Sequence, residues 1–130
     1  MKILRGLVDT HKGISNYEGD LARGLFVLGE AHRATKSYDQ AQKAYEEAIA
    51  IQTTLMRAHP DVPLYQSALA TTQYSLGILH EELALYDQAL AAYDQVISLL
   101  EPLSKAYPEE EEYQGNLKFV QARKAKLMSK

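Results

Sequence analysis

Cysteine is absent from this chain of 130 residues, so disulfide bonds, thiolate metal sites and a cysteine nucleophile are all excluded. Long apolar runs are missing as well, and no stretch approaches the length of a membrane-spanning helix. The first eight residues, MKILRGLV, lack the continuous apolar stretch of a signal peptide. We therefore expect a soluble, cytoplasmic protein that does not insert into a membrane.

An excess of positive charge is also missing. Lys and Arg number 14 against 17 Asp and Glu, for a formal charge of -3, far from the basic footprint of a nucleic-acid-binding protein. No glycine-rich phosphate loop or serine nucleophile elbow occurs, and residues 80–84 read HEELA rather than the zinc motif HExxH. We expect no enzyme activity, no metal, no cofactor and no nucleic-acid partner.

What the sequence does contain is an internal repeat with a period of 48 residues. Residues 13–60 and 61–108 are identical at sixteen of 48 positions, where chance would give about three. The clearest matches are LGEAH with LGILH and YDQAQKAY with YDQALAAY. At 46% hydrophobic residues, the chain is rich enough to fold as one domain around a core.

The repeat register divides this single domain, 1–130, into four parts. They are a partial helix of a preceding unit at 1–12, repeat 1 at 13–60, repeat 2 at 61–108 and a C-terminal capping helix at 109–130. Internal repeats of this length are typical of solenoids, in which each unit packs only on its neighbours.

Each repeat is predicted to form two antiparallel helices. In the first helix of repeat 1, one stripe at helical spacing carries Tyr17, Leu21, Leu25, Leu28 and His32. The expected buried faces of the second helices are Ala41, Ala44, Tyr45, Ala48, Ile49 and Leu55, and Ala89, Ala92, Tyr93, Val96, Ile97 and Leu103. No stretch alternates with the period of two that a half-buried strand shows, so the fold is predicted to be all-α.

Local signals set the expected helix ends. Ser15, Asp61, Asp39 and Asp87 are candidate N-caps. Pro102 lies inside the predicted second helix of repeat 2, where it should kink or break the helix.

Two glycines, Gly29 and Gly77, fall in the middle of the predicted first helices. Glycine costs nearly 1 kcal/mol relative to alanine at such a position, and the same cost in both repeats needs a reason. We expect close approach of the partner helix, with Ala41 and Ala89 as the matching small residues.

The spacing resembles the tetratricopeptide repeat. The residues that carry the resemblance are Leu28, Gly29, His32, Tyr38, Ala41, Tyr45 and Ala48, and Leu76, Gly77, His80, Tyr86, Ala89, Tyr93 and Val96. His32 and His80 replace a packing aromatic, and Val96 replaces a small residue. The family's usual period is 34, so the chain is similar to the long-period arrays of bacterial multi-repeat proteins. The resemblance implies a right-handed α-solenoid of about six helices.

The resemblance also implies a scaffold or adaptor that binds a protein partner, as a peptide or helix, in a concave groove. By position, the residues facing that groove are Arg23, Phe26, Glu30, Arg33, Thr71, Tyr74, Ile78 and Glu81. Phe26 and Tyr74 are equivalent aromatics that either anchor a partner or pack against the neighbouring hairpin. The family's basic clamp for C-terminal carboxylates is not matched, because Phe26, Glu30 and Ser75 occupy its positions.

The two ends of the chain support an alternative, a self-assembling structural protein. The first ten residues place Ile3, Leu4, Leu7 and Val8 on one face, and the last helix lacks a partner helix. Head-to-tail docking of such ends would give a homo-oligomer. The cations of the last helix either solvate the end of the stack or touch a membrane or nucleic acid; they are Lys118, Arg123, Lys124, Lys126 and Lys130. The acidic run 109–112 is expected to favour the positive N-terminus of that helix.

Overall fold

The computed structural model describes residues 10–129, and the side chains of residues 17–129. This part of the chain forms five α-helices and no strand. They are α1 (Thr10–Ala34), α2 (Tyr38–Ala58), α3 (Pro63–Glu82), α4 (Tyr86–Ala106) and α5 (Glu111–Met128). The predicted all-α repeat fold is confirmed, with five described helices rather than about six.

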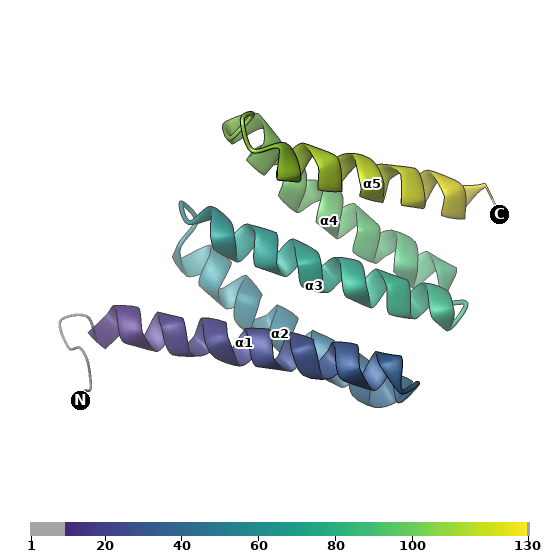
Figure 1. Cartoon of the computed structure of the whole chain (residues 1–130), viewed down its shortest axis with the longest axis horizontal. Coiled ribbons are helices and arrows are strands. Elements are labelled where there is room, and N and C mark those ends of the chain that lie inside the picture. Colours follow the sequence, from purple (N-terminus) through teal and green to yellow (C-terminus); the bar gives the residue numbers. More distant parts are fainter. Residues whose placement is uncertain (1–9, 130) are drawn as a thin grey trace.

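The helices stack as two hairpins and a final single helix. The hairpins are α1 with α2 and α3 with α4, while α2 also packs on α3 and α4 on α5. Figure 1 shows α1, α3 and α5 in the nearer layer, with α2 and α4 behind them. Both second helices are 21 residues long and begin 48 residues apart, so the sequence period is also the structural period.

The two hairpins share the same tight turn. Lys36 and Ala84, also 48 residues apart, both adopt positive φ values, 63° and 61°. In the second turn the amide of Leu85 donates to the carbonyl of His80 at 2.8 Å, and the amide of Ala84 donates to that of Glu81 at 3.0 Å. These two bonds form a Schellman motif, which satisfies the last carbonyls of α3 and reverses the chain.

The mid-helix glycines lie beneath tyrosine rings. A Cβ on Gly29 would stand 2.6 Å from Cε1 of Tyr45, and one on Gly77 would stand 2.5 Å from Cε1 of Tyr93. The expectation of a close approach is therefore correct, but the contact differs. A tyrosine ring of the second helix, rather than the small residue Ala41 or Ala89, occupies the space that each glycine leaves.

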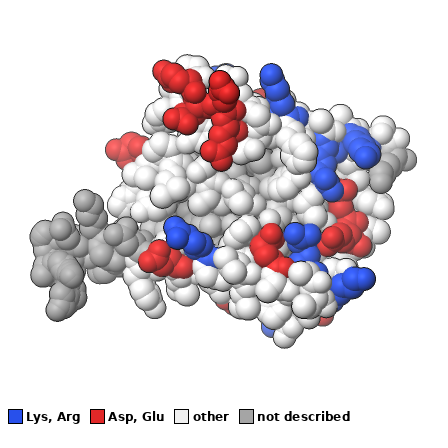
Figure 2. All heavy atoms as spheres, in the orientation of Figure 1, with Lys and Arg blue, Asp and Glu red and all other residues white. Residues whose placement is uncertain are grey.

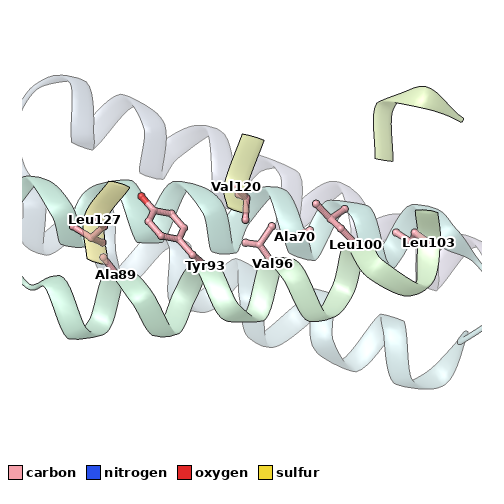
Figure 3. Packing of buried hydrophobic residues seen from close by; sticks show 8 residues of the cluster. All are labelled: Ala70, Ala89, Tyr93, Val96, Leu100, Leu103, Val120 and Leu127. Carbon is pink, nitrogen blue, oxygen red and sulfur yellow. The ribbon is translucent and has the colours of Figure 1, made fainter. Parts of the chain in front are cut away.

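Of the two apolar clusters formed by the described residues, the larger joins α3, α4 and α5. Figure 3 shows its buried residues from α3, α4 and α5, among them Ala70, Tyr93 and Val120. A smaller cluster, made of Ala41, Tyr45, Leu76 and Leu79, joins the two hairpins. The predicted buried faces of α2 and α4 are buried except for Ile49 and Ile97, which are half-buried.

Several predicted helix ends are wrong. Ser15 lies inside α1 instead of capping it, because α1 already begins at Thr10. Asp39 and Asp87 lie in the first turns of α2 and α4, one residue after the first helical position. Asp61 precedes the cap residue of α3. At these last three positions the carboxylate lies close to a positive helix end without capping it.

Pro102 does not break α4, which continues to Ala106. Pro102 and Ser98, whose carbonyl loses its helical partner, are both exposed, so water can satisfy that carbonyl. Of the predicted partial helix at 1–12, residues 1–9 lie outside the described part of the chain, and residues 10–12 belong to α1. No helix within residues 10–129 is long and apolar enough to cross a membrane.

Candidate functional site

A groove opens between α3 and α5 and has α4 as its floor. The cavity in it measures about 850 Å³. We call it the α3–α5 groove and define it by its lining residues, which are Val62, Pro63, Leu64, Ser67, Ala68, Ala70, Thr71, Tyr74, Val96, Leu100, Glu112, Tyr113, Asn116, Phe119 and Val120. In Figure 2 the corresponding region between the helices is a hollow of mostly uncharged surface.

The local sequence explains why the groove stays open. Along its floor, Val96 and Leu100 are buried beneath α3 and α5. Ser67, Ala68 and Thr71 are short side chains on the wall formed by α3, so they leave the space above that floor unfilled. One end is closed by aromatic rings, since the ring centroid of Tyr74 lies 5.9 Å from that of Phe119. Phe119 still exposes 58% of its surface.

The eight residues predicted to face a partner do not share one environment. Thr71 and Tyr74 line the α3–α5 groove. Arg23 is exposed on α1, and Phe26 packs against Tyr45 with 6.1 Å between ring centroids. The other four are half-buried and make internal contacts: Glu30, Arg33, Ile78 and Glu81.

Three of the four charged members of the predicted set, Glu30, Arg33 and Glu81, bond to buried tyrosines. The hydroxyl of Tyr45 donates to Glu30, and Arg33 donates to the same hydroxyl at 3.4 Å. Arg33 also lies 3.4 Å from Glu82 of α3, which links the two hairpins. Burial, followed by the hydrogen bond to Glu30, raises the pKa of Tyr45 to about 12, so the phenol stays protonated and acts as the donor.

The second hairpin repeats the motif with a partner from α5. The hydroxyl of Tyr93 donates to Glu81, and Nε of Arg123 lies 2.8 Å from Glu81 Oε1 and 3.1 Å from the Tyr93 hydroxyl. Burial, followed by the bond to Glu81, raises the pKa of Tyr93. Arg123 was expected to be solvated at the end of the stack, but it docks α5 onto the second hairpin. Lys124 likewise pairs with Asp94 of α4.

Two of the groove positions carry more polar residues in repeat 1 than in repeat 2. Gln52 stands 48 residues before Leu100 and is buried, and its Oε1 has no hydrogen-bond partner among the described residues. Arg23 occupies the position of Thr71. Val96 and Leu100, which form the floor of the α3–α5 groove, are thus matched in repeat 1 by Ala48 and Gln52.

Sequence reasoning missed most of this groove. The predicted set covered the first helices of repeats 1 and 2, whereas much of the lining comes from the start of α3 and from α5. One signal was present. Tyr113 and Leu117 continue the repeat register of Tyr65 and Leu69, and this register places Asn116 and Phe119 at the positions of Ala68 and Thr71.

Comparison with known families gives two matches along the chain. Models of the tetratricopeptide repeat match residues 22–54 and residues 70–99. Each match covers the C-terminal part of a first helix and most of the following second helix. The chain is a tetratricopeptide repeat protein. No curated protein and no solved structure matches it significantly.

Tetratricopeptide repeats generally mediate protein–protein interactions and typically act without catalysis. In this tetratricopeptide repeat protein, only Ala70, Thr71, Tyr74 and Val96 of the groove lining fall within the matched segments. The rest comes from the segments that lengthen each unit and from α5. Most of the groove lining therefore comes from residues beyond the matched segments, at the start of α3 and in α5.

Proposed function

We propose that the protein is a non-enzymatic scaffold that binds a peptide or helical segment of a partner protein in the α3–α5 groove. The observation that carries this proposal is an open cavity of about 850 Å³ with a mostly apolar lining. A volume between about 300 and 1,000 Å³ is typical of ligand-binding clefts. In a repeat protein of this family, a segment of another protein is the natural occupant.

The side chains supply both anchoring and orientation. Tyr74 and Phe119 offer partly exposed rings, and aromatic residues are frequent hot spots at interfaces. Ser67, Thr71 and Asn116 add hydrogen-bonding groups to the same groove. A few polar groups among apolar ones fix the orientation of a bound segment.

A library experiment tests the groove without a known partner. A phage-displayed library of random peptides would be selected on the wild-type protein and then tested on Thr71→Trp, which fills the groove from an exposed position on α3. The matched control is Arg23→Trp, because Arg23 is the exposed equivalent in α1 and does not line the groove. We expect selected peptides to bind the wild type and the control but not Thr71→Trp. Selection of no peptide with this pattern would contradict the proposal.

A specific observation also supports the second candidate function, self-assembly. In α3, Leu69 and Leu76 are only 5% and 9% exposed. Their equivalents in α1, Leu21 and Leu28, are 44% and 46% exposed, because no helix among the described residues covers them as α2 covers α3. A second copy of the chain could cover this face of α1.

A further inference from the structure

We propose that the α3–α5 groove selects segments in which a basic side chain flanks the apolar anchors, and that this basic residue lies at the end where α3 and α5 begin. The inference rests on the proposed function, because it specifies the chemistry of the same ligand. In the lining of the groove, Glu112 is the only charged residue among the described side chains.

The loops at this end of the groove carry further negative charge on both sides. Asp61 precedes α3, and Glu109, Glu110 and Glu111 precede Glu112 at the start of α5. All five carboxylate side chains are exposed. Figure 2 shows acidic residues gathered at the border of the hollow where α5 begins. The groove therefore has an acidic mouth, defined by Asp61 and residues 109–112.

Among the side chains of residues 17–129, no basic group forms an ion pair with a carboxylate of this acidic mouth. The nearest cations along the sequence are Arg57 and Lys105, in the last turns of α2 and α4. Two cations leave an excess of three negative charges around the mouth. The first turn of α5 offsets part of that excess through its helix dipole.

The other end of the groove offers no comparable charge. Arg123 lies beyond the Tyr74–Phe119 pair, but it is bound to Glu81 and to the Tyr93 hydroxyl. Since its charge is already compensated, an incoming acidic residue would compete with an existing ion pair. The electrostatic preference of the groove therefore comes from its acidic mouth, and complementary charges mainly set specificity and orientation.

The composition of the selected peptides tests this inference separately from the proposed function. We expect peptides that bind the wild type and Arg23→Trp, but not Thr71→Trp, to be enriched in Lys or Arg on one side of their apolar residues. Groove-dependent peptides without this enrichment, or with acidic flanks, would overturn the inference while the proposed function stands. Failure to obtain any groove-dependent peptide would overturn both.

Charge variants then locate the interaction. For a synthetic peptide from that selection, Glu112→Gln should weaken binding about two- to fivefold, as expected for one partly exposed ion pair. Glu47→Gln, an equal charge change at an exposed site on α2, should leave the affinity unchanged. Raising the salt concentration should weaken the wild type more than Glu112→Gln. Equal affinities of the two variants, measured by fluorescence anisotropy, would contradict the assignment of the basic residue to this end.

Discussion

At the scale of single residues, the glycines beneath the tyrosine rings give the sharpest test of packing. Gly77→Ala places a Cβ 2.5 Å from Tyr93 Cε1, so the ring or the helix must move. We expect a loss of about 1–3 kcal/mol in the free energy of unfolding, typical of an overpacked core. Urea denaturation followed by circular dichroism measures it.

The same substitution has the opposite effect where there is room. Nothing lies within 4 Å of a Cβ built on Gly115 of α5. Gly115→Ala should therefore stabilise the protein by up to about 1 kcal/mol through helix propensity alone. If both variants shifted stability in the same direction, the contact between Gly77 and Tyr93 would not control packing.

His80 gives a prediction about pH. It is buried between the hairpins, and burial lowers its pKa, whereas Glu46 of α2 acts in the opposite direction. Because the folded pKa lies below the unfolded value of about 6.5, the folded chain binds fewer protons. Above about pH 6.5 His80 is mostly neutral in both states and does not reduce the free energy of unfolding. That free energy decreases as the pH falls from this value towards the folded pKa.

The variant His80→Phe should remove this part of the pH dependence. Phenylalanine supplies an aromatic ring of similar shape, which is what the repeat family usually has at this position. Thermal unfolding between pH 5 and pH 7.5 is expected to show a smaller decrease in Tm for His80→Phe than for the wild type. Parallel decreases in the two proteins would show that His80 does not contribute to acid sensitivity.

At the scale of elements, α5 is held by the side chains that bridge it to the second hairpin. Arg123→Met keeps an apolar stem but removes the bonds to Glu81 and Tyr93. Since these groups are partly exposed, the loss should be about 1–2 kcal/mol, below the value for fully buried charged hydrogen bonds. Amides of α5 should then exchange about five- to thirtyfold faster with solvent.

Lys126→Met is the control for that experiment. Lys126 is exposed and lies on the same helix, so the substitution makes an equal change in charge without touching the bridge. Hydrogen exchange measured by NMR should leave its α5 amides close to wild-type rates. Equal acceleration in both variants would mean that net charge, rather than the Arg123 bridge, holds α5.

At the scale of the whole molecule, the 48-residue period predicted most of the architecture. It gave the hairpins and the buried faces of α2 and α4, because each of these depends on residues close in sequence. It could not give the place of the groove. That place depends on whether a later helix covers the equivalent face, and on single differences such as Leu100 for Gln52. The role of Arg123 was likewise hidden, because a cation on a terminal helix is equally consistent with solvation and with an inward bridge.

Assembly through the exposed face of α1 is also decided at this scale. Fully burying a leucine side chain contributes about 1.5–3 kcal/mol. Leu21 and Leu28 are already about half-buried, so covering the remainder adds only about 1.5–3 kcal/mol for the pair. Association itself costs about 4–15 kcal/mol. This face alone is therefore too small to hold two copies together at micromolar concentration.

Light scattering behind a sizing column measures the outcome directly. We expect a mass near 14.6 kDa from about 10 µM up to millimolar concentration, because even a millimolar dimer needs a net association free energy of about 4 kcal/mol, more than this face supplies. Leu21→Glu with Leu28→Glu should then leave the mass unchanged. A mass that climbs already at micromolar concentration, and returns to 14.6 kDa in the double variant, would make self-assembly the function and the groove secondary.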